Sequence, residues 1–319
     1  MRKVLGILGL LIAVSLATAL ASDAFLLPGN LENLLRRSAL FGILSVGAAF
    51  VIVTGGIDLS IGSVVCLSGC LLPWLIVEQG WSSAAALPAV LLLAVAIGVF
   101  HGLLITRLRL QPFVVTLCGL LLYRGVARGV TGDRTVGFLT GEELLRDLGS
   151  GRVPVTADFG LPAPFFYLLA IALLCHLFFE RTVFGRWLIA LGRNEQAARL
   201  SGVPTQRMIL ASYVVCSALA GLGGVLFVID VNSAQPSDFG NFYELYAIAG
   251  AVLGGCALRG GEISVLGVLI GAAVMQVLRN AIQLIEAIPT QIEFAVIGAV
   301  ILGGAVVDEL VRRVGRRRR

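Results

Sequence analysis

The chain is poor in the residues on which most enzyme chemistry depends. Its 319 residues include a single lysine, Lys3, and two histidines, His101 and His176. A GxxxxGK[ST] phosphate-binding loop needs a lysine at its end, so the sequence excludes one, and it contains no HExxH zinc motif. No Ser/His/Asp or Cys/His set, and no pair of aspartates in apolar segments, is arranged for hydrolysis. The sequence therefore favours a protein that is not an enzyme, with no metal and no cofactor.

Charge is also scarce, and its scarcity excludes an ordinary soluble domain. Charged residues make up 13% of the chain, against about 25% in soluble proteins, while 58% of the residues are hydrophobic and the mean hydropathy is +0.95. The apolar runs are continuous rather than alternating, which excludes a β-barrel. We predict an all-α, polytopic integral membrane protein with about ten transmembrane helices, and eight to ten as the range. The candidate segments are 4–21, 31–53, 60–77, 83–106, 112–130, 162–179, 207–230, 243–258, 263–285 and 292–311.

The first segment resembles a signal peptide, because Arg2 and Lys3 precede an apolar run that ends in small residues. The run is longer than the 7–15 residues or so of a usual signal core, and further membrane segments follow it. We therefore interpret it as an uncleaved first helix. The segments at 60 and 243 are short or rich in glycine, which indicates helices that are broken or half-buried.

The cysteines indicate neither a disulfide framework nor a metal site. All six lie in apolar segments and none forms a CxxC pair, so we interpret them as small hydrophobic residues. They are Cys66, Cys70, Cys118, Cys175, Cys216 and Cys256.

The distribution of basic residues predicts the orientation. With ten helices and a cytoplasmic N-terminus, both termini lie in the cytoplasm, and most of the 24 Lys and Arg residues fall on that side. This agrees with the positive-inside rule. The C-terminal stretch RRVGRRRR then faces anionic lipid headgroups of the bilayer. The net charge of +5 is thereby explained without a nucleic-acid partner.

Two polar insertions interrupt the apolar pattern. Residues 131–161 contain Gly, Pro and mixed charge, and fall outside the cell in this orientation. Residues 180–206 fall inside. There the stretch 190–200 predicts a short helix, with Asn194 as a cap for EQAARL and Gly202 as its stop. The alternative for this second insertion is a solvated loop without structure.

Three stretches resemble one family of membrane proteins. TGGIDLSIGS, residues 54–63, is similar to the GGIDLSVGS motif of ribose-type sugar permeases. Residues 182–203 resemble that family's cytoplasmic segment, T-x-x-G-R-x-x-x-A-x-G-x-N-x-x-A-A-R-L-S-G, and residues 232–261 resemble its S-A-Q-P loop and following helix. The positions that match the cytoplasmic segment are Thr182, Gly185, Arg186, Ala190, Gly192, Asn194, Ala197, Ala198, Arg199, Leu200, Ser201 and Gly202.

The resemblance implies a single permease domain over residues 1–319, in the inner (plasma) membrane of a bacterium. Such permeases are subunits of ABC importers for monosaccharides. The implied partners are a second permease copy, a separate ABC ATPase subunit and a periplasmic sugar-binding protein. The chain departs from the family at Tyr246, where aspartate is common, and at Arg259 and Glu262. These departures leave the identity of the sugar open.

Two sets of site residues follow from the resemblance. Residues 180–206 would form a coupling-helix loop that docks on the ATPase, with Gly185, Arg186, Gly192, Asn194, Glu195, Ala198, Arg199, Ser201 and Gly202 as coupling residues. Residues 131–161 would form a periplasmic loop. The residues of translocation or gating would be Gly55, Gly56, Asp58, Ser60, Asn232, Ser233, Gln235, Tyr243 and Glu244.

Asp58 is the least expected of these residues, because it lies between two segments able to cross a bilayer. Gly55 and Gly56 allow the backbone to bend there, and the side chain of Asp58 or Ser60 can cap the next helix. Unwound backbone at membrane depth must be packed in protein or line a cavity, and transporters bind or gate at such breaks. We keep three hypotheses for Asp58: a structural cap, a contact to the sugar, and a gate that is ion-paired to an arginine.

Two other functions remain as alternatives. A secondary transporter or channel for a small polar solute is one, although few acidic residues lie in apolar segments for proton coupling. A branched-chain amino-acid permease subunit is the other, and such permeases share the helix pattern but lack GGIDLS. If the chain moves a solute uphill, its energy comes from a partner chain or from an ion gradient.

Overall fold

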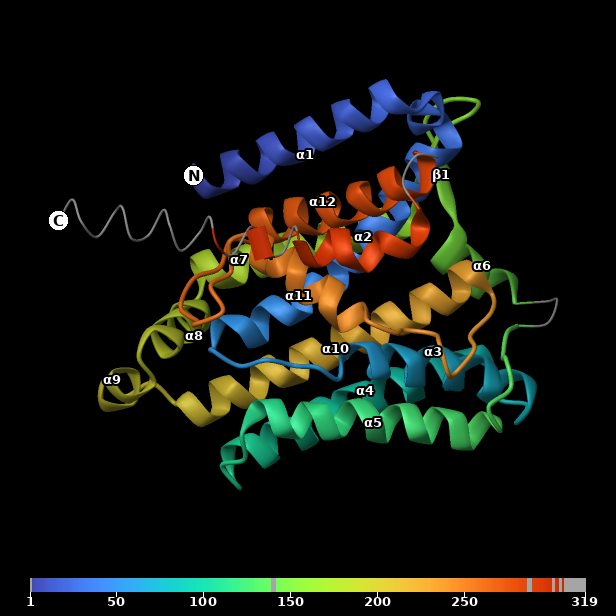
Figure 1. The fold of residues 1–319 in the computed structure, drawn as a ribbon. Helices are drawn as coiled ribbons and strands as arrows, with labels where there is room; N and C mark the ends of the chain where they lie inside the picture. Colours follow the sequence, from blue (N-terminus) through green and yellow to red (C-terminus); the bar gives the residue numbers. More distant parts are fainter. Residues whose placement is uncertain (1, 139–141, 286–288, 300–301, 304–305, 307–319) are drawn as a thin grey trace.

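A computed structural model describes residues 2–138, 142–285, 289–299, 302–303 and 306 of the chain. These residues form a helical bundle with one short hairpin, which confirms the all-α prediction (Figure 1). The helices are α1 (Arg2–Ala21), α2 (Pro28–Val53), α3 (Ile61–Val77), α4 (Ser83–Thr106), α5 (Pro112–Thr131), α6 (Glu143–Ser150), α7 (Ala163–Arg181), α8 (Val183–Arg193), α9 (Glu195–Leu200), α10 (Thr205–Val231), α11 (Tyr243–Leu253) and α12 (Val265–Leu284). Short 3-10 turns are η1 (Asp23–Leu26) and η2 (Thr290–Ile292), and the hairpin strands are β1 (Arg152–Pro154) and β2 (Gly160–Pro162).

The predicted number of about ten spans is not confirmed. Seven described helices are long and apolar enough to cross a membrane: α1, α2, α4, α5, α7, α10 and α12. The predicted segments 60–77 and 243–258 form the shorter helices α3 and α11. With 11 residues, α11 is only about 17 Å long at 1.5 Å per residue, roughly half the hydrocarbon thickness. Of the tenth segment, 292–311, the structure describes residues 292–299, 302–303 and 306, and residues 293–299 are helical; the rest of the segment lies outside the described residues.

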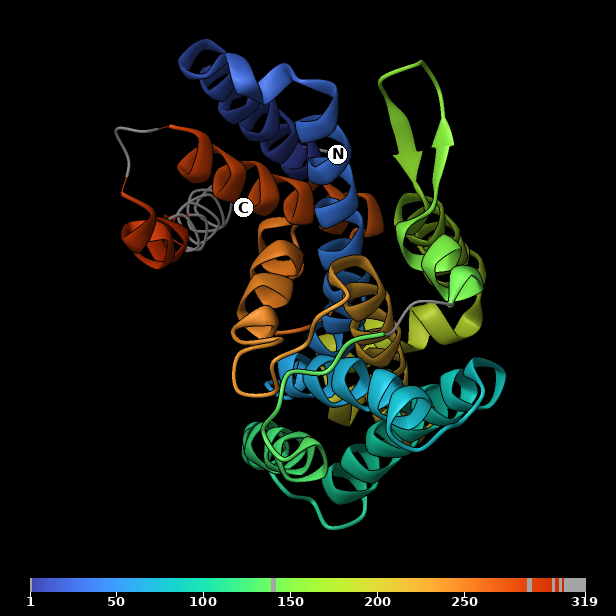
Figure 2. The same cartoon turned by 90° about the vertical axis from the view of Figure 1, so that its right-hand side faces the viewer.

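The centre of the bundle is made by α2 and α10 (Figure 2). From Ala39 to Val53, α2 is buried without interruption, because this stretch has apolar or small side chains on every face. Small residues also bring helices close together, as is usual in membranes. A Cβ on Gly98 of α4 would lie 2.6 Å from the Cα of Val214 in α10, so only glycine fits there.

The two ends of the bundle carry different structures (Figure 1). At one end, which we call the insertion end, lie α6 and the antiparallel hairpin β1–β2, which together span residues 143–162. At the other, the α9 end, α8 and α9 connect α7 to α10. α1 lies along α12 at the edge of the bundle.

The insertion 180–206 is helical, but its helix boundaries differ from the prediction. α8 begins at Val183 rather than at Ala190, capped by the hydroxyl of Thr182, which accepts the N–H of Gly185 at 3.1 Å. The chain then breaks at Asn194, whose Oδ1 accepts the N–H of Ala197 at 2.9 Å. The predicted Asn194 cap is therefore confirmed. Gly202 has a φ of +84°, which ends the helix as predicted.

Candidate functional site

The stretch TGGIDLS is an unwound segment inside the bundle. After α2 ends at Val53, residues 54–60 turn back from the α9 end, and α3 begins in the interior (Figure 1). The turn starts at Gly55, whose φ of +82° is costly for other residues. The carbonyl oxygen of Ile57 accepts hydrogen bonds from the hydroxyls of Tyr213 at 3.3 Å and Thr116 at 3.4 Å. Side chains of α10 and α5 thus supply hydrogen bonds to a backbone carbonyl that lies outside any helix.

Asp58 does not cap α3, so the hypothesis of a structural helix cap finds no support. Its Oδ1 accepts the backbone N–H of Ser60 at 2.8 Å and the Ser60 hydroxyl at 2.6 Å, which forms an Asx turn. Ser60 is the N-cap residue, and its side chain makes no capping bond. Asp58 lies two residues before the N-cap residue, so its carboxylate reaches Ser60 and not the free N–H groups of the first turn. Asp58 is 2% exposed.

The ion-pair hypothesis for Asp58 also finds no support in the described part of the chain. The ion pairs of those residues do not include Asp58. Its surroundings are polar: the Cys216 thiol lies close to the carboxylate, and the hydroxyl of Tyr123 pairs with Nε2 of His101 at 2.8 Å nearby. A buried carboxylate with no cation and several neutral donors is costly to retain, which makes this position a candidate for function.

The N-terminus of α3 receives its acidic partner from α11. The Glu244 carboxylate packs against Gly62 in the first turn of α3, where an added Cβ would overlap both this carboxylate and the carbonyl oxygen of Gly240. A carboxylate near a helix N-terminus is favoured by the free N–H groups and the helix dipole. Two short helices, α3 and α11, therefore begin at the same point, and three predicted residues, Asp58, Ser60 and Glu244, lie around it.

The other predicted gating residues lie at the insertion end. Asn232 has a φ of +50° and accepts the N–H of Phe138 through Oδ1 at 2.8 Å. Gln235 donates to the carbonyl oxygen of Asp133 at 3.3 Å and accepts from the Thr135 hydroxyl. Ser233 is exposed between them. These residues tie the loop 232–242 to the start of the 131–161 insertion, and the structure does not bring them to Asp58.

Sequence reasoning missed Arg124 of α5. One of its terminal nitrogens lies 3.1 Å from the carbonyl oxygen of Pro236, 3.4 Å from that of Ser237 and 3.2 Å from that of Phe239. Arginine presents several donors in a fixed geometry, so a single side chain can hold a loop of carbonyls. An arginine directly after the apolar run of α5 was the available signal.

Glycines bring three segments together at the α9 end. The N–H of Gly261 donates to the carbonyl oxygen of Val53 at 2.9 Å. A Cβ on Gly192 would overlap both of these atoms, and a Cβ on Gly260 would lie 2.8 Å from the nitrogen of Gly55. We call Val53, Gly55, Gly192, Gly260 and Gly261 the glycine junction. Because backbones touch there, the end of α8 cannot shift without displacing the end of α2.

A cavity of about 470 Å³ beside the glycine junction joins the two predicted sets of residues. Gly55 and Gly56 line it from the unwound segment, Glu195 and Arg199 from α9, and Tyr213 from α10. The sequence analysis assigned gating to Gly55 and Gly56, and coupling to residues of α9. Nothing in the sequence indicated that the two sets lie together.

The remaining coupling residues divide between packing and surface. Gly185 and Ala198 are buried, and a Cβ on Gly185 would overlap the backbone of Phe178 and lie 2.5 Å from the Cα of Phe179. Arg186, Ser201 and Gly202 are exposed. So are the apolar side chains of Phe184 and Leu200, the latter at 82%. α8 and α9 thus present a mixed apolar and charged surface beyond the bundle.

Comparison with known proteins places the chain among transport permeases. The family described as "Branched-chain amino acid transport system / permease component" matches residues 30–305. The ribose import permease protein RbsC of Escherichia coli K12 is 35% identical over 304 residues, which cover 95% of this chain and 92% of the relative. RbsC of Bacillus subtilis 168 is 34% identical over 308 residues, covering 97% and 93%. The xylose transport system permease protein XylH of E. coli K12 is 32% identical over 359 residues, covering 95% and 91%.

No solved structure matches the chain significantly. The family match spans the unwound segment, the glycine junction and α8–α9 alike. The relatives cover almost the whole chain at more than 30% identity. This protein belongs to the branched-chain amino acid transport system / permease component family, and it is an integral membrane protein.

Proposed function

We propose that this chain is the membrane subunit of a bacterial ABC importer for a ribose-type monosaccharide. The named relatives are ribose import permeases and a xylose transport system permease, and the chain carries TGGIDLSIGS, which resembles the motif of sugar permeases. In this proposal a periplasmic binding protein delivers the sugar, a separate ATPase subunit supplies the energy, and two permease subunits pair in the membrane. The chain itself is not catalytic.

The proposed topology has ten membrane segments, with both termini in the cytoplasm of the cell. The α9 end then faces the cytoplasm and the insertion end faces the periplasm. The single permease domain spans residues 1–319, the 131–161 loop meets the binding protein, and the 180–206 loop meets the ATPase. The mixed surface of α8 and α9, with Leu200 82% exposed, supports a partner at that end.

The single observation that carries the coupling mechanism is the shared cavity of the unwound segment and α9. Closure of the ATPase would push α8–α9 as a rigid element. The backbone contacts of Gly192 would pass that motion to Val53 and Gly261. The unwound segment after Val53 would then change its bend and alter the meeting point of α3 and α11. In this scheme the chain converts a push at its surface into a change at membrane depth.

The test of coupling uses the importer reconstituted in vesicles with the ATPase and binding protein of the same genome. Glu195→Ala and Arg199→Ala, separately and together, should reduce ATP-driven uptake of D-ribose or D-xylose at least tenfold, with normal amounts of permease in the membrane. Gln79→Ala, which is exposed before α4 at the insertion end, is the control. Uptake that survives these substitutions but stops when the proton gradient is dissipated at constant ATP would instead identify a secondary transporter.

Topology has its own test. Asp158 and Gln196 are both exposed, the first in the β1–β2 hairpin and the second on α9. We expect Asp158→Cys to react with a membrane-impermeant maleimide in intact spheroplasts, and Gln196→Cys to react only after permeabilisation. Labelling of both from the same side would contradict the proposed orientation.

A further inference from the structure

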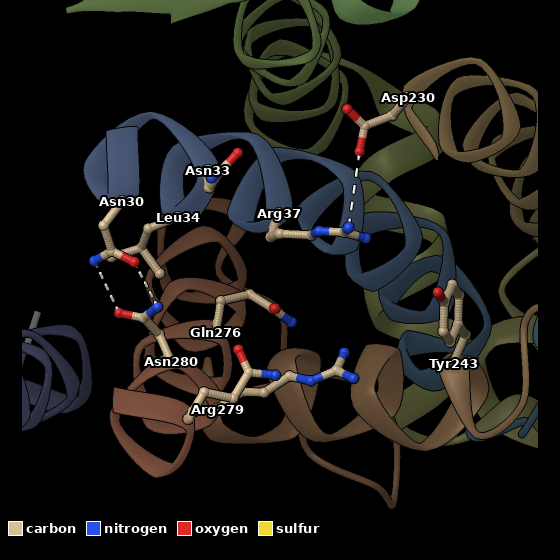
Figure 3. Close-up of a pocket in the computed structure, with 10 residues that line it drawn as sticks. Asn30, Asn33, Leu34, Arg37, Asp230, Tyr243, Gln276, Arg279 and Asn280 are labelled. Carbon is tan, nitrogen blue, oxygen red and sulfur yellow. Dashed lines mark hydrogen bonds and ion pairs between the residues drawn. The ribbon is translucent and has the colours of Figure 1, made fainter. Parts of the chain in front are cut away.

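A second cavity, of about 400 Å³, lies at the insertion end between α2, α10, α11 and α12 (Figure 3). Binding pockets for small molecules commonly measure about 300–1,000 Å³, so the space suits a small solute. Of the residues that line it, the sequence had singled out only Tyr243 as a site residue. The lining residues are Asn30, Asn33, Leu34, Arg37, Asp230, Tyr243, Gln276, Arg279, Asn280 and Gln283.

The lining is dominated by side-chain amides, which are rare in membrane helices. Five of the ten lining residues are Asn or Gln, and they come from α2 and α12. An amide offers two donors and an acceptor without charge, so a ring of amides matches a ligand whose groups both donate and accept. Polar side chains inside a membrane bundle are costly unless they serve a path or a site. Hydroxyl groups of a neutral polyol fit this pattern.

Gln276 provides the most direct sign of a ligand. Its side chain is 3% exposed, and its amide nitrogen has no hydrogen-bond partner among the described residues. In Figure 3 the amide points into the space between α2 and α12, toward Tyr243. A buried donor left without an acceptor is destabilising, so this amide favours a ligand that can accept from it. By contrast, the amides of Asn30 and Asn280 satisfy each other at 3.1 and 2.8 Å.

The charges around the cavity are paired, which argues against an anionic ligand. Asp230 binds Arg36 at 2.8 Å and lies 3.9 Å from Arg37. Arg279 pairs with Glu293 at 2.9 Å, and Glu293 also accepts the hydroxyl of Tyr246 at 2.8 Å. A phosphate or carboxylate would compete with the carboxylates of Asp230 and Glu293 for these arginines. A neutral ligand can instead bind the free amide while the ion pairs remain.

We propose that this amide cavity is a binding site for a neutral monosaccharide entering the permease. The inference rests on the proposed function, which makes the insertion end the side of delivery. Gln276 donates to a sugar hydroxyl from the wall of the cavity, and Asn33 and Gln283 bind from its mouth, where both are exposed. The sugar then lies beside the first turn of α11, which contains both Tyr243 and Glu244.

The first test compares Gln276→Leu with Gln79→Leu in the reconstituted importer. Leucine keeps the volume and apolar packing but removes the amide. We expect Gln276→Leu to lower uptake of D-ribose or D-xylose at least tenfold, while ATP hydrolysis stimulated by the binding protein persists and Gln79→Leu behaves as wild type. Uptake by Gln276→Leu within twofold of wild type would overturn the site and leave the proposed function intact. Failure of the wild-type importer to take up either sugar would remove the proposed function itself, and this inference with it.

A second test remains decisive if Gln276→Leu does not fold. Asn33→Cys is made in a Cys118→Ser background, because Cys118 is the exposed cysteine of the chain. In the complete importer, D-ribose or D-xylose should slow alkylation of Asn33→Cys at least fivefold and leave alkylation of Gln79→Cys unchanged. Equal labelling with and without sugar would contradict the proposal. So would protection by inorganic phosphate in place of sugar, since that outcome indicates an anion site.

Discussion

The two ends of the bundle are held together by different forces. At the α9 end, Gly192, Gly260 and Val53 meet through their backbones, and a single added Cβ would overlap a neighbour. At the insertion end, Asp230, Arg36 and Glu32 form a chain of ion pairs with N–O distances of 2.8 and 3.1 Å. At the α9 end there is no room for a side chain at the glycine contacts, whereas at the insertion end the side chains themselves make the contacts.

This difference indicates a division of work. Contacts between backbones have no side-chain rotamers that could change. A displacement of α8 should therefore pass through the glycine junction to the end of α2. Ion pairs and amides can exchange partners at modest cost, so the insertion end can accept and release a polar solute. Breaking a contact at each end should therefore give opposite results: the α9 end should lose coupling, and the insertion end should lose stability or binding.

The largest effect is expected at Asp230. Its side chain is 8% exposed and bound to Arg36, which is 14% exposed, so Asp230→Ala leaves a buried arginine short of a partner. Removing one member of a buried ion pair costs about 3–5 kcal/mol. We expect a large fall in the midpoint of thermal unfolding of the purified protein in detergent.

The matched variant for Asp230 removes both charges. Asp230→Leu combined with Arg36→Leu should recover part of the lost stability, because no buried charge remains unpaired. A double variant as unstable as the sum of its single changes would mean that the ion pair has no special part at this end.

At the α9 end, Gly192→Ala should lower the stability less than Asp230→Ala does, but it should reduce coupled transport more. The added methyl overlaps the carbonyl oxygen of Val53 and the nitrogen of Gly261, both of which are backbone atoms. Overpacking costs typically about 1–3 kcal/mol, and the displaced junction should uncouple ATP hydrolysis from uptake. Gly125→Ala is the control, since a Cβ there meets nothing within 4 Å. Coupled uptake in Gly192→Ala equal to that of Gly125→Ala would refute the role of the junction.

The sequence predicted well whatever depends on a continuous local pattern. The segments 83–106 and 207–230 correspond to α4 (Ser83–Thr106) and α10 (Thr205–Val231), because long apolar runs mark membrane helices with no need of neighbours. The cap at Asn194 is equally local, a side chain bonded three residues ahead. The same reasoning failed for Asp58, because an Asx turn and a helix cap use the same residue types at almost the same spacing.

What the sequence could not predict depends on contacts between distant segments. Gly55, Gly192 and Gly260 are far apart in the chain, and nothing local indicates that they touch. Asn30 and Asn280 are separated by 250 positions, so the amide cavity has no motif. Glu244 was selected as a gating residue, but its position against Gly62 depends on two shorter helices, α3 and α11, meeting inside the bundle.

A smaller effect is expected at Asp58. Asp58→Asn keeps an oxygen acceptor for the N–H and hydroxyl of Ser60, so it should fold and transport almost normally. Asp58→Ala leaves the buried N–H of Ser60 without its acceptor, at a cost of about 1–2 kcal/mol. Thermal unfolding and sugar uptake, measured on both variants, distinguish a role of Asp58 in forming the turn from a role of its negative charge. Equal loss of uptake in Asn and Ala variants, at equal amounts in the membrane, would show that the negative charge itself is required.

The smallest effect is expected at Asp133, although its ion pair looks strong. Arg128 donates to both carboxylate oxygens at 2.9 and 2.7 Å, and this hydrogen bonding lowers the pKa of Asp133. Any stabilisation from the pair is therefore present above the pKa of the unfolded chain and lost as the pH falls through the lower folded value. Both side chains are exposed, at 52% and 42%, so water and salt screen the pair. Asp133 also has a φ of +58°, which asparagine adopts readily and β-branched residues do not. Asp133→Asn should thus leave the midpoint of thermal unfolding unchanged at pH 7, whereas Asp133→Val should lower it. An equally large fall in the Asn variant would mean that the charge of Asp133 matters more than its backbone conformation at this turn.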